Sequence, residues 1–362
     1  MSSNDPSSDP EFSSSFSSSA TPLHNVSPEE DSPSIENSNS SNTEQATSTA
    51  AHVSNVTGET VPVSETPISA TPPKPRIWSV VLTMLAATST FIAISVIMVF
   101  IVAAILTATG KNMNMSSPEL MMESLMSLPS TVLLFIVPPH LGILAIVILA
   151  AYLSPSPFAK RLALNRPTWP WWVTVATVLA APFCSFLWTL VVNSMFESNA
   201  YMEQMSEMFQ SSSEGMGFAM TLLCIAALPS FSEEWLFRGY IQSRLVQRWS
   251  PWLAILVSSV LFAAFHMEPL HVIAVLPLGL WLGFVSYRCA SIIPAMLAHA
   301  YNNTLSLISV VYEQADSLDT SISSLTNQLI IFLGVPSLLI FIAYLVTTHK
   351  QKPVVDANTP AA

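Results

Sequence analysis

The stretch IWSVVLTMLAATSTFIAISVIMVFIVAAIL, from Ile77 to Leu106, contains no charged residue. It is longer than the ~20 residues that an α-helix needs to cross a hydrocarbon layer ~30 Å thick. An unbroken apolar run of this length is typical of a membrane helix. It predicts that the chain first enters a bilayer near residue 77.

Seven further apolar stretches follow, and they extend the same prediction along the chain. Some contain prolines, such as Pro182 and Pro277, which membrane helices tolerate as kinks. The predicted fold class is therefore all-α, a polytopic transmembrane bundle of about eight helices within residues 73–350. The expected spans are 77–107, 129–153, 169–195, 216–247, 250–267, 270–287, 291–312 and 328–348.

The composition separates this bundle from an acidic N-terminal tail. The chain is 51% hydrophobic and 10% charged, whereas soluble proteins contain about 25% charged residues. Its formal charge of -11 arises largely before residue 70, a region with no Lys or Arg. Residues 1–72 are rich in Ser, Thr and Pro and predict a disordered cytoplasmic tail, and residues 351–362 a short C-terminal tail. The rest is nearly neutral, so nucleic acid is not an expected partner.

The basic residues predict how the bundle is oriented. They fall in alternate loops, and the intervening loops carry acidic residues, with Lys111 as the exception. Basic loops stay in the cytoplasm, so eight spans with both termini cytoplasmic fit this pattern. We expect a multi-pass protein of a bacterial cell membrane. The basic residues concerned are Lys74, Arg76, Lys160, Arg161, Arg166, Arg244, Arg248, Arg288, Lys350 and Lys352.

Ionisable and amide side chains inside the predicted spans are the candidates for function. A charge at mid-bilayer costs at least ~2.5–3.5 kcal/mol, so such residues are functional candidates by default. Three different spans contribute them. They are Glu233, Glu234 and Arg238 in the fourth span, His266 in the fifth, and His299 and Asn303 in the seventh.

Helix periodicity distinguishes the two glutamates. Glu234 and Arg238 are four residues apart, so they share a helix face and can form an ion pair. Glu233 points about 100° away, is not neutralised by that arginine, and is the better candidate for a general base. We therefore assign Glu233 to chemistry and the other two residues to orienting it.

The histidines complete a set of groups suited to amide hydrolysis. His266 can polarise a water molecule together with Glu233. His299 and Asn303 are four residues apart, and they can supply donors to a developing oxyanion. Base, water and oxyanion stabiliser are what the hydrolysis of a peptide bond requires.

The same residues could instead form a metal site. Glu233, His266 and His299 form a two-histidine, one-carboxylate set, which is common around catalytic zinc. However, the helical HExxH signature is missing, and the three residues come from three helices. Whether zinc is a cofactor is thus left open by the sequence.

Residue counting also predicts depths within the membrane. At 1.5 Å per residue, Glu233 and His266 lie about 22–24 Å from the predicted cytoplasmic ends of their helices, whereas His299 lies at only ~12 Å. His299 is therefore expected to be shallower than the other two unless its helix tilts.

The chain resembles the CAAX protease and bacteriocin-processing (CPBP) family of intramembrane endopeptidases, which includes the type II CAAX prenyl proteases. The EExxxR signature matches Glu233–Arg238, FxxxH matches Phe262–His266, and HxxxN matches His299–Asn303. The three motifs occur in the family's order within residues 216–312. The resemblance implies that Glu233 and His266 activate water and that His299 and Asn303 stabilise the oxyanion. Phe262 is expected to orient its helix by packing.

The resemblance and the buried charges leave two other classes of function to be distinguished from the endopeptidase. Members of the family are associated with bacteriocin self-immunity, in which binding without catalysis is sufficient. Buried Glu and His also serve as proton relays in transporters. The leading expectation is an intramembrane endopeptidase, glutamate-dependent or a metalloprotease, acting on a membrane-associated or lipid-modified polypeptide.

Overall fold

The structure is a computed structural model, and it describes residues 76–110, 116–117, 120–121, 124, 131–197, 200–313 and 319–349. All of these belong to one compact unit, Ala70–Ala362. The regular elements in these ranges are helices, and no strand occurs among them. The all-α prediction is therefore confirmed. The predicted tails, residues 1–72 and 351–362, lie outside the described residues.

Each of the eight predicted spans corresponds to helical backbone. Two further helices lie in the connections, α4 (Phe158–Arg161) and α6 (Ala200–Met216). The helices of the predicted spans are α1 (Ile77–Ala108), α3 (Thr131–Tyr152), α5 (Trp171–Met195), the composite segment α7 to α9 (Phe218–Leu245), α10 (Pro251–Ala264), α11 (Pro269–Cys289), α12 (Ile293–Glu313) and α13 (Asp319–His349).

Of these, five helices among the described residues are long and apolar enough to cross a membrane: α1, α3, α5, α11 and α13. The segment at 218–245 is broken into short pieces, and α12 carries the polar residues His299 and Asn303. Helix α10 has 14 residues and so rises only about 21 Å, less than the ~30 Å hydrocarbon layer. A helical membrane bundle is confirmed, with eight as an approximate number of spans.

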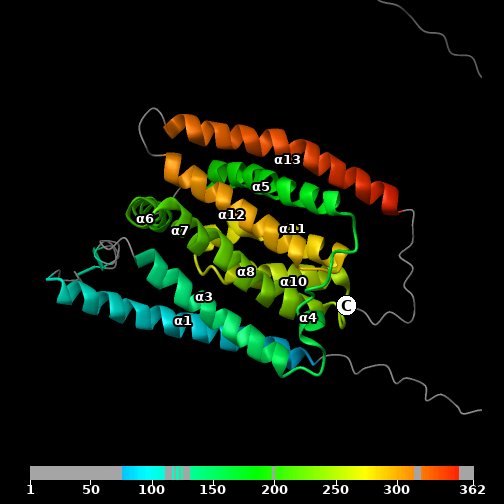
Figure 1. Cartoon of the computed structure of the whole chain (residues 1–362), viewed down its shortest axis with the longest axis horizontal. Coiled ribbons are helices and arrows are strands. Elements are labelled where there is room, and N and C mark those ends of the chain that lie inside the picture. Colours follow the sequence, from blue (N-terminus) through cyan, green and yellow to red (C-terminus); the bar gives the residue numbers. More distant parts are fainter. Residues whose placement is uncertain are drawn as a thin grey trace, which may run out of the picture. The chain divides into compact units, whose positions relative to one another are not determined.

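The helices pack in three layers (Figure 1). Helices α1 and α3 pack against each other on one side, and α5 and α13 pack against each other on the opposite side. Between them lie the composite segment, α10, α11 and α12, which contact one another. The predicted site residues are all in this central layer, where neighbouring helices shield them from lipid.

The composite segment contains two stretches of π-helix, η1 (Leu223–Ala227) and η2 (Trp235–Gln242). They flank α8 (Leu228–Glu234), whose second residue is Pro229, a residue with no N–H to donate. A π-helical turn contains one residue more than an α-helical turn and is frequent at functional sites. Every residue of η2 from Leu236 to Gln242 is buried.

A close backbone contact ties the α4 loop to η2. A Cβ added to Gly239 would lie 3.0 Å from the Leu162 carbonyl oxygen, so only glycine allows this approach. The loop is further fixed where the Ile292 N–H donates to the Ala163 carbonyl at 3.0 Å. The short α4 loop is therefore held rigidly against the central layer.

Replacing Gly239 with alanine is expected to lower the free energy of unfolding by about 1–3 kcal/mol, because the new Cβ meets backbone that cannot move aside. Gly142→Ala is the matched control, since its Cβ would first meet the Ile94 Cδ1 atom, the end of a flexible side chain. Chemical denaturation of the purified protein measures both effects. Equal costs at the two glycines would show that the Leu162 contact is not the cause.

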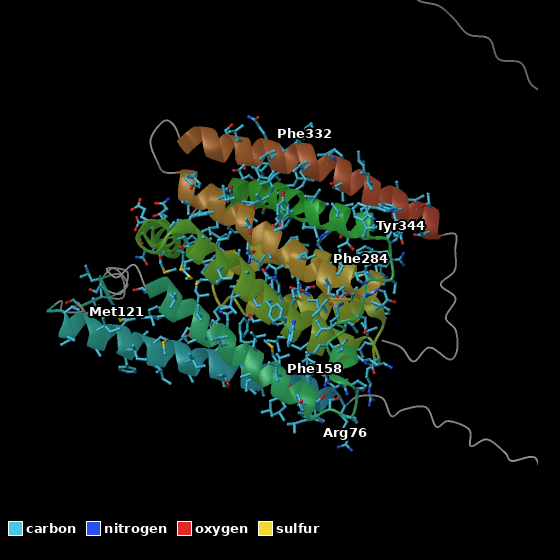
Figure 2. All side chains as sticks on the ribbon, in the orientation of Figure 1. Arg76, Met121, Phe158, Phe284, Phe332 and Tyr344 are labelled. Atoms are coloured by element: carbon cyan, nitrogen blue, oxygen red, sulfur yellow. The ribbon has the colours of Figure 1, made fainter. Side chains whose placement is uncertain are left out.

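Exposed aromatic residues gather at one end of the bundle, which we call the aromatic end. Trp78 begins α1, Tyr152 ends α3, Trp171 begins α5 and Trp252 begins α10, and all four are exposed. Figure 2 shows Arg76 and Tyr344, near the first and last described residues, toward this same end. Tryptophan and tyrosine are enriched where a membrane meets water, so the aromatic end marks one membrane interface.

Candidate active site

A buried ion pair lies at the centre of the site. The Arg238 guanidinium donates from Nη1 to Glu234 Oε1 at 2.8 Å, and both side chains are fully buried. Arg238 also donates from Nη2 to the Gly279 carbonyl at 2.8 Å, and it lies 4.4 Å from the centre of the Phe262 ring. Arg238 thereby links the composite segment to α10 and α11.

His299 joins this ion pair from α12. Its Nδ1 lies 3.0 Å from Glu234 Oε1, the same oxygen that receives Arg238. His299 was expected to be shallower than Glu233 and His266 unless its helix tilts, and this contact places its side chain beside Glu234, the neighbour of Glu233. The count assumed that the helices start in one plane and run parallel to the membrane normal.

Glu233 points away from the ion pair and meets a residue of α3. Its Oε1 lies 3.4 Å from His140 Nε2, and both side chains are buried. The other oxygen, Glu233 Oε2, is buried and has no hydrogen-bond partner among the described residues. A buried carboxylate oxygen without a partner is costly. Glu234 Oε2 is likewise buried and without a partner among these residues, but Glu234 is already paired with Arg238, so Glu233 Oε2 is the better place for a polar molecule to bind.

His140 is a member of the site that the sequence reasoning did not assign to it. Its Nδ1 lies 2.7 Å from the Ile136 carbonyl. Its ring packs edge-on against Phe91 at 5.7 Å. The signal that could have found it is the one used for the other residues, an ionisable group within an apolar span.

His266 lies just beyond the end of α10, where its Nδ1 is 3.1 Å from the Phe262 carbonyl. It is close enough to Glu233 for electrostatic interaction. Its ring also lies 4.6 Å from that of His271, which the sequence placed in a solvated loop. Because α10 begins at the aromatic end and rises only about 21 Å, His266 lies within the thickness of the bilayer.

Phe262 packs at the centre of these groups. Its ring contacts the ring of His266 at 5.2 Å and that of His299 at 5.5 Å, besides the Arg238 guanidinium. A Cβ at Gly279 would come within 3.0 Å of the Phe262 ring. The phenyl ring therefore separates the two imidazoles and fixes the direction in which each points.

Asn303 lies one helical turn beyond His299 and contacts the composite segment. Its Nδ2 donates to Ser230 Oγ at 3.4 Å, and Ser230 in turn donates to the Ala226 carbonyl at 2.6 Å. The amide is thus held by one of its two N–H groups, which leaves the second available. The structure brings together Glu234, Arg238, His299 and Phe262 by direct contact, and Glu233 with His140.

The donor groups do not form a metal site in this arrangement. Within the described part of the chain, no three His, Cys, Asp or Glu side chains are placed so that they could hold one metal ion. The Nδ1 atoms of His266 and His299 are already engaged, by the Phe262 carbonyl and by Glu234. These contacts leave Nε2 free on both rings, and histidine commonly binds a metal through one nitrogen while the other is held by a carbonyl or carboxylate. Zinc bound by Glu233, His266 and His299 therefore stays a prediction.

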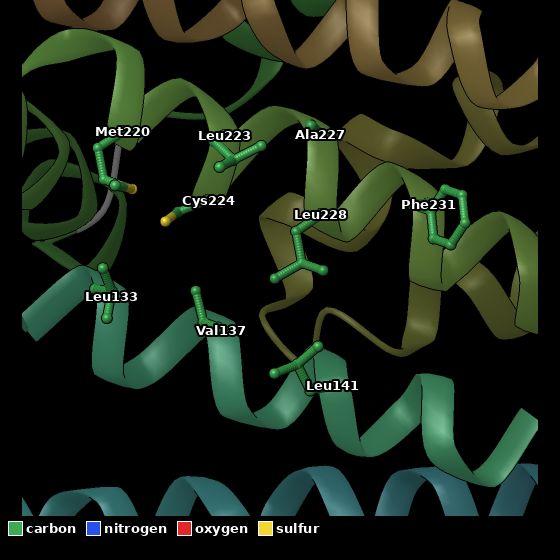
Figure 3. A pocket seen from close by; sticks show the side chains of 9 residues that line it. All are labelled: Leu133, Val137, Leu141, Met220, Leu223, Cys224, Ala227, Leu228 and Phe231. Atoms are coloured by element: carbon green, nitrogen blue, oxygen red, sulfur yellow. The ribbon is translucent and has the colours of Figure 1, made fainter.

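An apolar cavity of about 520 Å³ lies beside the site. It is formed between α3 and the segment from α7 to α8 (Figure 3). One end lies at Leu133 and Met220, and the other at Leu141 and Phe231. Leu141 adjoins His140 in α3, and Phe231 lies one turn before the two glutamates, so the cavity runs along the helices that carry the His140–Glu233 pair.

Comparison with known proteins agrees with the motifs. The family model described as type II CAAX prenyl endopeptidase Rce1-like matches residues 215–305, a segment that contains all three motifs. No curated protein and no solved structure matches the chain. The match covers about a quarter of the chain, and His140 lies outside it. Over residues 215–305 the chain is therefore similar to the type II CAAX prenyl endopeptidases.

Proposed function

We propose that this protein is an intramembrane endopeptidase in which Glu233 activates a water molecule. The observation that supports this most directly is the buried and unpartnered Glu233 Oε2 in an otherwise apolar bundle. A buried carboxylate oxygen that is free of any hydrogen bond among the described residues is suited to accept a proton from a single bound water.

In the proposed reaction, water binds to Glu233 Oε2 and to His266. His266 donates from Nδ1 to the Phe262 carbonyl, so in its neutral form Nε2 is an acceptor for the second water proton. Glu233 takes one proton as the water oxygen attacks the carbonyl carbon of the scissile bond. It then returns that proton to the leaving amine when the C–N bond breaks, and no acyl-enzyme forms.

The oxyanion of the tetrahedral intermediate would be stabilised by His299 and Asn303. His299 is held through Nδ1 by Glu234, so Nε2 is its free nitrogen, and it donates when the ring is protonated. The Asn303 amide has a second N–H beyond the one given to Ser230. Donors fixed before the reaction stabilise a developing charge without reorganisation.

The apolar cavity supports a membrane-associated substrate. Its nine lining residues are all apolar or cysteine, and it offers no charge to bind a soluble polar peptide. We propose that it receives the apolar part of a membrane-associated or lipid-modified polypeptide, whose scissile bond then lies beside Glu233.

We propose that His140 is a positioning residue for Glu233. Its Nδ1 donates to the Ile136 carbonyl, so a neutral ring would present a lone pair at Nε2 to a carboxylate oxygen. One proton must therefore lie between His140 Nε2 and Glu233 Oε1. This contact fixes Oε1 and directs Oε2 toward the water.

His140→Phe is accordingly expected to lower kcat by about 10–100-fold, because a hydrogen bond to a charged group contributes ~1.5–3 kcal/mol. KM should be unchanged, and His140→Gln, whose amide can donate to Glu233, should recover part of the loss. The phenyl ring preserves the packing against Phe91, so a kcat of His140→Phe equal to the wild type would refute the positioning role.

The proteolytic function is tested by comparing the membrane proteins of cells that carry the wild type and Glu233→Ala. We expect at least one membrane protein to accumulate uncleaved in the variant, and purified wild-type enzyme to cleave it. If a Glu233→Gln variant complements a null strain fully, binding without catalysis is sufficient, and a role in bacteriocin self-immunity or assembly replaces the protease. Transport of a solute by the reconstituted protein, without cleavage, would identify the proton-relay alternative instead.

We propose that the aromatic end faces the cytoplasm, as the basic loops predict. Three exposed basic residues lie at this end, Lys160 in α4, Arg166 in the loop after it and Arg288 in the last turn of α11. Basic loops are retained in the cytoplasm. A membrane-impermeant reagent should label a cysteine introduced at Arg166 only from the cytoplasmic side. Labelling from the opposite side in intact cells would invert the proposed topology.

A further inference from the structure

Two arginines near the aromatic end are buried without an acidic partner. Arg161 of α4 is 9% exposed, and Arg244 of α9 (Ser243–Leu245) is 4% exposed. Arg161 Nε has no hydrogen-bond partner, and Arg244 donates from Nη1 to the Tyr240 carbonyl at 3.1 Å. Among the described residues, the carboxylates in ion pairs are Glu233 and Glu234, and neither pairs with these arginines.

Both arginines lie near Tyr240. The Arg244 guanidinium carbon is 3.2 Å from the centre of the Tyr240 ring. Arg161 lies within electrostatic range of both Arg244 and Tyr240. Buried charges in proteins are normally paired, and neither arginine is paired with a carboxylate among the described residues. The pair is therefore a site that an anion would stabilise.

The backbone fixes this pair in place. Leu162, the residue after Arg161, packs against Gly239, the residue before Tyr240. The next residue of the loop, Ala163, accepts the Ile292 N–H at 3.0 Å. Arg161 is thus presented to Tyr240 by a rigid loop, which reduces the entropy that a bound anion would have to offset.

The position of the pair indicates which anion is available. Arg161 follows α3 and Arg244 ends the composite segment, so both lie at the end of the bundle that carries exposed Trp78, Tyr152 and Trp252. Aromatic side chains of this kind sit at the level of the lipid headgroups. Arginine matches the geometry of phosphate oxygens, which it binds through two parallel hydrogen bonds.

We propose that Arg161 and Arg244 together bind the phosphate of an anionic phospholipid at the aromatic end of the bundle. Basic pockets between membrane helices on the cytoplasmic side bind anionic headgroups by the same chemistry. The site is separate from Glu233 and its partners, and it anchors the α4 loop against η2.

Native mass spectrometry of the detergent-purified full chain tests this site. Phosphatidylglycerol is the probe, phosphatidylcholine is the zwitterionic comparison, and inorganic phosphate is the lipid-free source of the same group. We expect Arg161→Gln with Arg244→Gln to weaken phosphatidylglycerol binding by at least about tenfold, since charge-assisted hydrogen bonds to phosphate are lost. The matched control, Arg166→Gln with Arg288→Gln, removes two exposed arginines and should change binding by less than about twofold.

Circular dichroism and the unfolding temperature establish whether the variant with glutamine at both Arg161 and Arg244 folds. If it does not, the double substitution by lysine is used, because it keeps both charges and loses the paired geometry, and it is expected to bind phosphatidylglycerol more weakly than the wild type. If inorganic phosphate binds the wild type as tightly as phosphatidylglycerol does, the ligand of this site is a free anion and not the lipid. Equal phosphatidylglycerol binding by the wild type and either folded variant would overturn the proposal.

Discussion

Glu233→Gln is expected to lower kcat for peptide-bond hydrolysis by about 10²–10⁴-fold, the contribution typical of a general base. Glutamine has nearly the shape of glutamate, and its amide can still contact His140, so KM should change little. The loss arises because the amide cannot accept a proton from the water that would bind at Glu233 Oε2, the buried oxygen with no partner among the described residues. A substrate found by membrane proteomics, cleaved by purified enzyme in detergent, provides the measurement.

Glu207→Gln is the matched control, because it makes the same chemical change at an exposed position of α6. It should leave kcat and KM at the wild-type values. Full activity of Glu233→Gln would refute the proposed chemistry, and with it the protease mechanism. Loss of activity in Glu233→Gln with full activity in His140→Phe would refute only the role of His140, so the two proposals fail separately.

Arg238→Met should lower the free energy of unfolding by about 3–5 kcal/mol, the cost of breaking a buried ion pair by removing one partner. Glu234 Oε1 would lose its 2.8 Å contact, and the Gly279 carbonyl would lose its side-chain donor. Glu234 would then remain as a buried charge with only His299 beside it. Unfolding in a denaturing detergent, followed by circular dichroism, measures the change.

Arg238→Lys should recover less than half of the loss, because one ammonium group does not reproduce the planar fork that reaches Glu234 and Gly279 together. Arg288→Met serves as the control, since this arginine is exposed near the end of α11 and should cost less than about 1 kcal/mol. A stability of Arg238→Met near that of the wild type would show that this ion pair does not support the central layer.

Much of the fold was predictable because a membrane helix appears in the sequence as a long apolar run. The apolar runs located every long helix to within a few residues, apart from α13, which begins nine residues earlier than expected. The breaks in the fourth span were not predictable, because π-helical turns depend on how Pro229 and its neighbours pack, and apolarity does not report on this. The shortness of α10 was also missed, since Phe265 continues the apolar pattern past the last helical residue.

For the site, spacing along one helix was informative and spacing between helices was not. The contact between Glu234 and Arg238 follows from their separation by four residues. The contact between Glu233 and His140 joins residues 93 positions apart, and no periodicity connects α3 with α8. The relative depths of Glu233 and His299 could not be counted from the sequence for the same reason, since they depend on where each helix starts and how it tilts. The catalytic roles of Glu233, His266, His299 and Asn303 stay predictions.

Helix α3 contributes to the site, but it lies outside residues 215–305, the segment that the family model matches. A fragment that begins at residue 215 would carry all three motifs, yet it would lack the imidazole beside Glu233 and one wall of the apolar cavity. Grafting residues 215–305 into another bundle should therefore transfer the sequence signature without transferring the activity, unless the host supplies a helix with a histidine at the level of Glu233.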